Sequence, residues 1–553
     1  MKRISGVCFF ESLRDSWKGA VMTKVFNVTA DCKADRHYMV NIAERLVRIK
    51  KLVDDGAYFT INRARQYGKT TTLRALARYL QRDYYVVLLD FQTVSSEKLE
   101  SEKAFSVSFA RLFLKAFKAS CGKMSNELDN VFTQMKESAG GSLFSLQELF
   151  EGLSDICSAS DRPVVLMIDE VDSAANNQVF LDFLAQLRAY YINRDMQAAF
   201  QSVILAGVYD IKNLRRKLRP EDSHRVNSPW NIAADFNVDM SFSTEEIAGM
   251  LAEYEADYQT GMDIYEMAGL LRDYTSGYPF LVSRLCKLMD EEVFQKADFG
   301  SKKRAWTRDG FLEAVKIILA EKNTLFESLS EKLVSYPELD SMLRSLLFAG
   351  KAFSYNFYEP SINIATMFGL VKNQNGVLAV ANRIFETWLY NLYLSSSEMQ
   401  STNIYASSVR DKSAFIVDGQ LNMRQILEKF VVHFNDLYGD RDEAFIEEEG
   451  RKYFLLYLRP IINGTGNYYI ESRTREMRRT DVIVDYCGEQ YIIEMKIWHG
   501  NEYNLRGEAQ LTGYLDDYHK NVGYMLSFNF NKNKKIGVQE HIIGDRKLIE
   551  ATV

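Results

Sequence analysis

A glycine, a lysine and a threonine stand together at a spacing that suits phosphate binding. Residues 63–70 read RARQYGKT and lie between an apolar stretch and a stretch with helical spacing. Backbone N–H groups at the start of such a helix can surround a phosphate chain. Lys69 would reach the β- and γ-phosphates of a nucleotide, and Thr70 would hold Mg²⁺. Arg63 replaces the first glycine of the GxxxxGK[ST] pattern, where glycine normally allows a sharp turn.

Two acids follow a second apolar stretch. Residues 164–170 read VVLMIDE, which predicts a buried strand that ends in Asp169 and Glu170. A carboxylate at such a strand end can hold the water shell of Mg²⁺, and the next acid can orient or deprotonate the attacking water. Each motif alone also fits an ordinary helix start or a strand-end cap. Together, each at the end of a strand, they favour a site for ATP and Mg²⁺.

A third group lies near the C-terminus, where Asp481, Glu494 and Lys496 form the pattern D-x12-E-x-K. If a hairpin turns about Gly488, residues whose numbers sum to about 976 face each other, so Asp481 would lie opposite Met495, beside the other two. Carboxylates can bind Mg²⁺ against a phosphodiester, and a lysine can position water or stabilise the developing anion. The same sequence pattern is also compatible with a hairpin at the edge of a sheet that exposes a Glu–Lys pair.

The surroundings of this hairpin favour the chemical interpretation. Gln510 and Tyr514 share a helix face at i and i+4. Glu448 and Glu449 begin a helix that could add a third carboxylate. Four arginines that could bind a phosphate backbone precede the hairpin: Arg473, Arg475, Arg478 and Arg479.

The elements that must position these groups alternate along the first part of the chain. Short apolar stretches predict strands at 58–62, 85–91, 164–168 and 202–208, and helical spacing separates them. Strands that alternate with helices favour a parallel α/β sheet.

The second part of the chain has a different order. Helical spacing runs from about 243 to 320, and helical segments with a turn at 373–376 are compatible with a winged-helix module. Residues 396–420 are rich in serine and other polar residues, which predicts a linker. A compact α/β unit is then predicted, with helices at 423–438, 445–458 and 505–518 and strands at 468–471, 481–486, 491–496 and 523–530.

Composition excludes several classes of protein. Of the 553 residues, 47% are apolar and 26% charged, which excludes a mainly disordered chain. The net charge of −6 gives no sign of a nucleic-acid coat protein, but local patches govern binding, so a nucleic-acid enzyme is not excluded. No HExxH or CxxC pattern supports a zinc hydrolase. Without a membrane-spanning apolar run or a signal peptide, we expect a cytoplasmic protein with no membrane partner.

Residues from about 26 to 395 resemble the AAA-like ATPase domains of bacterial and archaeal proteins that often carry a C-terminal nuclease-like domain. The strings that carry the resemblance are NRARQYGKTTTL, VVLMIDEVDS, SVILAGVYDIKNL, TSGYPFLVSRLC and ANRIFETWLYNLYL. Some members have RxRxxGK in place of the complete motif. The resemblance implies nucleotide binding by these residues: Arg63, Arg65, Gly68, Lys69, Thr70, Thr71 and Asp169.

The same resemblance implies further roles. Thr70 and Asp169 would hold Mg²⁺, and Glu170 would orient the attacking water. Asp210 is a candidate sensor residue, just past the fourth predicted strand. The arginine finger stays open among Arg215, Arg216 and Arg225.

Residues of about 424–535 resemble the PD-(D/E)XK nuclease superfamily. The resemblance makes Asp481, Glu494 and Lys496 the core catalytic triad, with metal bound by the two acids. Gln510 and Tyr514 match the QxxxY helix of a subset of these nucleases. The helical glutamate of the family, a further metal ligand, would be Glu448 or Glu449. Thr480 stands where the family has proline, which removes no ligand.

These observations predict an α/β protein: a P-loop NTPase parallel sheet with a helical lid and a winged-helix-like segment, followed by a restriction-endonuclease-like α/β nuclease domain. The expected parts are an N-terminal extension (1–25), an AAA-like ATPase core (26–240), a helical lid (241–326), a winged-helix-like segment (327–395), a linker (396–422) and a nuclease-like domain (423–553).

The expected function is an ATP-binding and ATP-hydrolysing regulatory module coupled to a metal-dependent nuclease that hydrolyses phosphodiester bonds in DNA or RNA, with DNA the favoured partner. The cofactors would be ATP and Mg²⁺. A homo-oligomer formed through the ATPase domain is compatible with this scheme. The alternative is an ATP-dependent conformational switch that binds nucleic acid or a protein partner without cleaving it.

Overall fold

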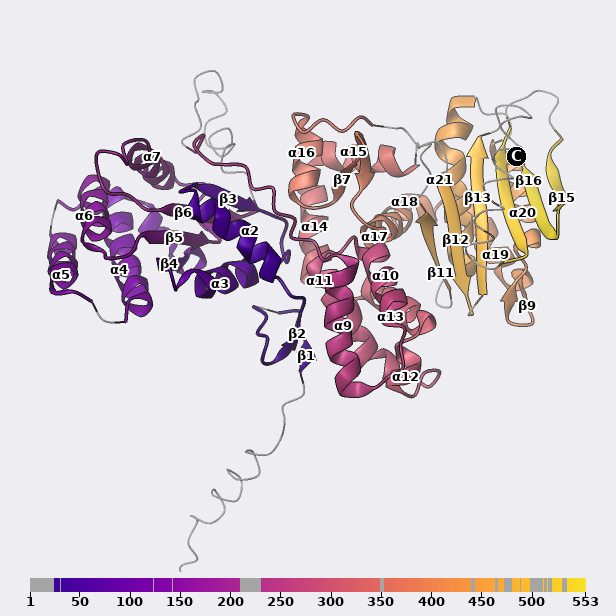
Figure 1. Cartoon of the computed structure of the whole chain (residues 1–553). Helices are drawn as coiled ribbons and strands as arrows, with labels where there is room; N and C mark the ends of the chain where they lie inside the picture. Colours follow the sequence, from indigo (N-terminus) through magenta and orange to yellow (C-terminus); the bar gives the residue numbers. More distant parts are fainter. Residues whose placement is uncertain are drawn as a thin grey trace, which may run out of the picture. The chain divides into compact units, whose positions relative to one another are not determined.

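The computed structural model describes the chain in several ranges (Figure 1). The described residues are 24–29, 31–122, 124–141, 143–208, 230–348, 353–438, 443–462, 466–471, 480–487, 489–497, 511, 515, 520–529 and 535–553. The chain divides into two compact units, the first of Met1–Arg272 and Gly277–Phe311, the second of Asp273–Ser276 and Leu312–Val553. Within the described ranges, no helix has both the length and the apolar character that crossing a bilayer requires.

A parallel sheet of four strands lies in the first unit. Its strands are β3 (Phe59–Asn62), β4 (Tyr85–Asp90), β5 (Val164–Asp169) and β6 (Ser202–Gly207), in the spatial order β3-β6-β5-β4. Each predicted strand is present, with ends that differ by at most one residue. The predicted parallel α/β sheet is therefore confirmed.

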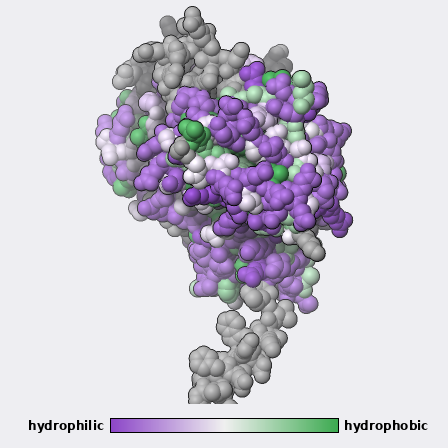
Figure 2. Space-filling model, turned by 90° about the vertical axis from the view of Figure 1, so that its left-hand side faces the viewer, coloured by the Kyte–Doolittle hydropathy of each residue, from purple (hydrophilic) through white to green (hydrophobic). Residues whose placement is uncertain are grey.

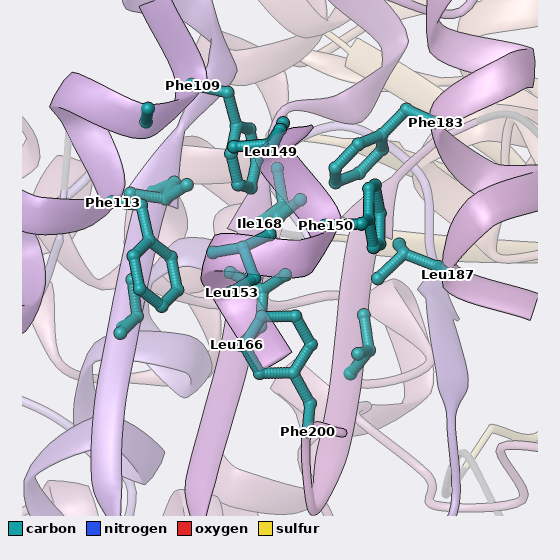
Figure 3. Packing of buried hydrophobic residues seen from close by; sticks show 14 of the residues in the cluster. Phe109, Phe113, Leu149, Phe150, Leu153, Leu166, Ile168, Phe183, Leu187 and Phe200 are labelled. Carbon is teal, nitrogen blue, oxygen red and sulfur yellow. The ribbon is translucent and has the colours of Figure 1, made fainter. Parts of the chain in front are cut away.

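Helices cover both faces of this sheet. They are α2 (Ala43–Asp54), α3 (Lys69–Leu80), α4 (Glu102–Ser120), α5 (Asn126–Gly140), α6 (Leu146–Ala159) and α7 (Gln178–Ile192). Leu166 and Ile168 of β5 pack into the core formed with α4 to α7 (Figure 3). The intervening Val165 and Met167 pack into a second core with α2 and α3. On the side of the molecule where α4 to α7 lie, the surface is mostly hydrophilic, as expected for helices that bury one face (Figure 2).

Helices also follow the sheet in sequence, as predicted. They are α9 (Thr244–Tyr258), α10 (Ile264–Thr275), α11 (Pro279–Glu291), α12 (Lys302–Ala305) and α13 (Arg308–Ala320). The short parallel strands β1 (Val25–Phe26) and β2 (His37–Tyr38) pack against α11 and α9. Phe26, Tyr38, Tyr254 and Trp306 form an aromatic cluster with ring centroids 4.6 to 5.8 Å apart. The predicted N-terminal extension lies outside the described residues up to residue 23.

The second unit begins with helices and a hairpin. These elements are α14 (Thr324–Ser335), α15 (Pro337–Phe348), α16 (Pro360–Met367), β7 (Val371–Gln374), β8 (Val377–Val380) and α17 (Arg383–Leu394). Asn375 and Gly376 join the two strands with φ values of 54° and 87°. Two such residues are typical of a tight hairpin turn. The predicted hairpin is therefore present and follows three helices.

The stretch predicted to be a linker is folded. It contains α18 (Ser397–Gln400), α19 (Asn403–Asp411), η7 (Lys412–Phe415), β9 (Ile416–Val417) and β10 (Gln420–Leu421). Ile404 is buried, and the hydroxyl of Ser408 donates to the backbone carbonyl of Tyr457. Ser396 caps the backbone N–H of Met399 at 3.3 Å. The serines that suggested a linker thus cap a helix or bond to buried backbone, and the prediction over 396–422 is corrected.

A mixed sheet follows α20 (Met423–Tyr438) and α21 (Glu443–Ile462). Its strands are β11 (Gly466–Glu471), β12 (Thr480–Tyr486), β13 (Glu489–Ile497), β14 (Val522–Phe528), β15 (Gly537–Ile543) and β16 (Arg546–Thr552), in the order β11-β12-β13-β14-β16-β15. The sequence analysis missed β15 and β16. Of the helix predicted at 505–518, only Leu511 and Leu515 are described.

Candidate functional site

The loop between β3 and α3 has the backbone shape of an anion site. Gly68 caps α3 with a φ of 81°, and Gln66 has a φ of 57°. Left-handed residues near a helix start can turn successive backbone N–H groups toward one point, where they bind an anion. Lys69 is the first residue of α3. The backbone therefore fits the predicted phosphate loop, although a glutamine takes one left-handed position.

The side chain of Lys69 is buried at this loop. Its Nζ donates to the carbonyl oxygens of Arg63 and Ala64, at 2.9 and 3.0 Å. Burial lowers the pKa of the Lys69 ammonium, and the nearby Glu170 carboxylate opposes this effect. Two carbonyl groups of the loop thus bind the Lys69 ammonium at the start of α3.

The two nucleotide motifs meet through Thr70 and Asp169. The Thr70 hydroxyl donates to Oδ2 of Asp169 at 2.7 Å, and the backbone N–H of Glu170 donates to Oδ1 at 3.0 Å. Asp169 is buried, and burial raises its pKa, while the Thr70 hydrogen bond acts in the opposite direction. A hydroxyl beside a carboxylate is an oxygen pair that suits Mg²⁺.

Glu170 follows in a strained conformation, with a φ of 54°. Burial raises the pKa of its carboxyl group, and Lys69 opposes this shift. Asp172, which the sequence analysis did not single out, accepts a 2.6 Å hydrogen bond from the backbone N–H of Val208. Because Val208 follows β6, Asp172 fixes the chain where it leaves the sheet. The DExD spacing after a buried strand was the available signal.

Two of the remaining predicted ligands have partners within the chain, and a third is exposed. The Arg63 guanidinium donates to the carbonyls of Asn62 and Val238, both at 2.9 Å. The Arg65 side chain is exposed. The Thr71 hydroxyl accepts from the backbone N–H of Cys32 at 3.3 Å. The structure therefore gives Arg63 and Thr71 contacts within the chain and leaves the side chain of Arg65 at the surface.

Four further candidates lie outside the described residues. They are the sensor candidate Asp210 and the arginine-finger candidates Arg215, Arg216 and Arg225.

The C-terminal hairpin brings Asp481 and Glu494 directly opposite each other. The expected register, with Asp481 opposite Met495, is off by one residue. That difference matters, because a shift of one residue moves a side chain to the other face of the sheet. In the observed register Asp481, Glu494 and Lys496 belong to one face. The turn residue Cys487 has a φ of 48°, and it is this turn that sets the pairing.

The face that carries these residues is partly covered by apolar packing. Ile492 and Met525 pack with Leu511 and Leu515 in one hydrophobic cluster. Ile492 shares the face of Glu494, since the two are two residues apart on β13. Leu511 and Leu515, which belong to the range predicted to hold the QxxxY helix, therefore pack on the face of Glu494.

The buried charges are the strongest chemical feature of this sheet. Glu494 is 0% exposed and Lys496 is 2% exposed. Charged side chains are almost never buried without compensating groups. Their depth excludes the interpretation as an exposed Glu–Lys pair on an edge hairpin, because β13 lies between β12 and β14.

Two residues that the sequence analysis missed extend this face. Ser527 on β14 pairs with Lys496, and its hydroxyl donates to Oε1 of Glu550 on β16 at 2.8 Å. Nε2 of His541 lies 3.5 Å from Oε2 of Glu550. The missed signal was the short stretch Arg546–Thr552, with apolar Leu548, Ile549 and Ala551, which follows a turn at Gly544.

The structure describes only some of the side chains predicted for the C-terminal site. Gln510, Tyr514 and the side chains of Asp481, Glu448 and Glu449 lie outside the described residues, as do the four arginines at 473–479. Among the residues that are described, no group of three or more His, Cys, Asp or Glu side chains could hold a metal ion. The predicted metal set therefore depends on side chains beyond the described ones.

Comparison with known families assigns a large part of the chain to one family. Residues 33–391 match the model of a family described as an AAA-like domain. The match covers about two thirds of the 553 residues. The chain belongs to this AAA-like family. Both nucleotide motifs lie inside the matched range. The matched range ends before α18 and the C-terminal sheet.

Solved structures similar to this AAA-like protein include three from archaea. A Walker-type ATPase of Pyrococcus abyssi is 14% identical, with a TM-score of 0.46, and the alignment covers 66% of this chain and 99% of that one. The Aeropyrum pernix ORC2 protein, in ADPNP–ADP complexes, is 12% identical, with a TM-score of 0.39 and coverage of 68% and 98%. The Aeropyrum pernix ORC1 protein in complex with DNA is 12% identical, with a TM-score of 0.29 and coverage of 64% and 93%. No curated protein sequence matches the chain.

Proposed function

We propose that this chain is a nuclease whose metal-dependent cleavage of nucleic acid, DNA rather than RNA, is controlled by ATP bound in the AAA-like domain. The observation that carries the nuclease assignment is the register that pairs Asp481 with Glu494 and sets Lys496 on the same face. The bond between Thr70 and Asp169 supports the ATP site.

ATP would bind with its phosphates at the start of α3. Lys69 would exchange its bonds to the carbonyls of Arg63 and Ala64 for bonds to phosphate oxygens. The raised pKa of Glu170 suits a general base, because a carboxylate of higher pKa accepts a proton more readily. Thr70 and Asp169 are the residues that would hold Mg²⁺.

In the C-terminal sheet, Asp481 and Glu494 would hold the metal ion. A bound Mg²⁺ supplies a water of lowered pKa and neutralises charge on the phosphodiester. Lys496 would position that water or stabilise the negative charge that develops on the phosphate. Burial of Glu494 and Lys496 strengthens their interactions, since water does not screen them.

One observation favours the second function, a conformational switch without cleavage. In the described structure, the Lys69 ammonium is bound by two carbonyls of its own loop. A nucleotide must displace these bonds before it binds. A loop of this kind could bind ATP slowly and change conformation with little turnover, while the C-terminal sheet binds nucleic acid or a protein.

A cleavage assay on the full chain decides between the two functions. Labelled single- and double-stranded DNA and RNA would be incubated with Mg²⁺ or Mn²⁺, with and without ATP. The test variant is Glu494→Ala. The matched control is Glu489→Ala, which changes an exposed glutamate of the same strand whose partner is Lys520.

The nuclease proposal expects wild type and Glu489→Ala to cut DNA equally and Glu494→Ala to be inactive. It expects ATP to change the rate of cutting by wild type. Equal cleavage by folded Glu494→Ala would assign the activity to another site or to a contaminant. No cleavage under any condition, together with ATP-dependent binding of nucleic acid, would support the switch.

A further inference from the structure

The first turn of α11 contacts the phosphate loop through one tyrosine. The hydroxyl of Tyr278 donates to the carbonyl oxygen of Arg65. Its ring packs edge-on against the ring of Tyr67, with centroids 4.7 Å apart. Tyr278 is buried, and it precedes Pro279, the first residue of α11. A helix of the lid and two residues of the loop are therefore joined at one side chain.

The position of Tyr278 is set by the backbone around it. Gly277 has a φ of 71°, and its carbonyl accepts from the backbone N–H of Phe242 at 2.8 Å. A Cβ on Gly277 would lie 2.1 Å from the carbonyl oxygen of Phe242, so only glycine fits here. The segment before α9 and the start of α11 thus form one fixed support for the tyrosine.

The hydrogen bond acts on the peptide between Arg65 and Gln66. In a trans peptide the C=O and N–H groups point in opposite directions. When Tyr278 holds the Arg65 carbonyl, the N–H of Gln66 is turned away from the lid tyrosine. Gln66 also has a left-handed φ of 57°, which a non-glycine residue adopts only when its surroundings impose it. The Tyr278 hydroxyl holds the peptide plane that directly precedes this left-handed residue.

We propose that Tyr278 is a positioning residue for nucleotide binding. Through Arg65 and Tyr67 it keeps the loop 63–68 in the shape that receives phosphates, so less conformational entropy is lost when the nucleotide binds. Since such coupling is reciprocal, a bound nucleotide also stabilises the contact between the loop and α11. This inference rests on the proposed binding of ATP at this loop and adds the lid as its regulator.

The test variant is Tyr278→Phe, which removes only the hydroxyl. The chain offers a matched control in Tyr58→Phe. Tyr58 is also a buried tyrosine of the first unit, and its hydroxyl donates to a backbone carbonyl, that of Phe200, at 3.2 Å. Tyr58 precedes β3 in sequence, whereas the phosphate loop follows β3.

Two measurements separate positioning from stability: titration with a fluorescent ATP analogue, and thermal unfolding without nucleotide. We expect Tyr278→Phe to weaken nucleotide affinity by about fivefold, the loss expected for one hydrogen bond to a backbone carbonyl. Tyr58→Phe should keep wild-type affinity. Both variants should lower the unfolding temperature by similar amounts.

Hydrogen exchange supplies a readout that a structural role would not affect. In wild type, the nucleotide should slow exchange in the first turn of α11, and in Tyr278→Phe this response should be lost. If Tyr278→Phe does not fold, Tyr67→Leu tests the same contact by removing the other ring. Wild-type affinity and exchange in the folded variant would overturn the inference while leaving ATP binding intact. A wild-type chain that binds no nucleotide would overturn both.

Discussion

The hydroxyl of Thr70 and the carboxylate of Asp169 are joined by a 2.7 Å hydrogen bond across 99 residues of sequence. Thr70 follows β3 and Asp169 ends β5, and β6 lies between these strands. All three strands are parallel, so their carboxyl ends meet at one edge of the sheet, where ligands of such sheets bind. The bond therefore connects the phosphate loop directly to the acidic strand end.

Lys69 should control nucleotide affinity. Replacing it with alanine removes a charged donor to the phosphates, and we expect affinity for a fluorescent ATP analogue to fall by about tenfold or more. Lys50→Ala is the control, because Lys50 pairs with Asp54 and Asp83 at the surface of the same unit. Unchanged affinity in Lys69→Ala would mean that the loop is not a phosphate site.

Glu170→Gln should separate ATP binding from hydrolysis. A glutamine keeps the shape of the side chain but cannot accept the proton of water, so hydrolysis should fall by about 100-fold or more. Nucleotide affinity should change little. Phosphate release and analogue binding would be measured on the same samples, with Asp182→Asn on the surface of α7 as the control. A variant that hydrolyses ATP like wild type would remove Glu170 from the mechanism.

The same variant should change how stability depends on pH. Burial raises the folded-state pKa of Glu170 above its ordinary value of 4.5. A raised carboxyl pKa favours folding at low pH, and this contribution is lost as pH rises through the folded-state pKa. Near neutral pH, Glu170→Gln should therefore unfold at a higher temperature than wild type. The difference should shrink as the pH falls toward 4.5. A constant difference across that range would contradict the shift.

Substitutions of Lys496 and Glu494 should affect cleavage and metal affinity differently. Glu494→Ala removes a proposed metal ligand, so Mn²⁺ affinity, measured by calorimetry, should fall together with cleavage. Lys496→Ala should abolish cleavage but change Mn²⁺ affinity by less than about threefold, because its proposed role is in the chemical step. Glu489→Ala serves as the control for both. If the lysine variant still cuts DNA, Lys496 has no part in catalysis.

The segment 396–422 should behave as part of the folded second unit. Ile404→Ala truncates a fully buried side chain of α19 and should cost about 2 to 5 kcal/mol of unfolding free energy. Val409→Ala on the same helix, at a position 52% exposed, should cost much less. Urea unfolding of both variants measures the difference. Equal losses, or first cleavage by trypsin within 396–422, would indicate a linker after all.

The C-terminal hairpin shows why pairing could be predicted only approximately. The letters of β12 and β13 predict two strands and a turn, but the turn at Cys487 decides which residues face each other. An expected register one residue away would have put Asp481 and Glu494 on opposite faces. The residue types determine which chemistry is possible, whereas the backbone of the turn determines which residues face each other.

The sequence by itself determined the parallel sheet, because apolar runs such as 164–168 are buried whatever packs on them. It also determined which residues could bind phosphate or metal, since those roles depend on chemical type and local spacing. Only the tertiary structure decided the partners of Arg63 and Thr71, the packing of α19, the row from Lys496 through Ser527 to Glu550, and the contact of Tyr278 with the phosphate loop. These contacts join residues that are distant in sequence. Local sequence patterns predict which side chains are buried, but they do not predict which residues those side chains contact.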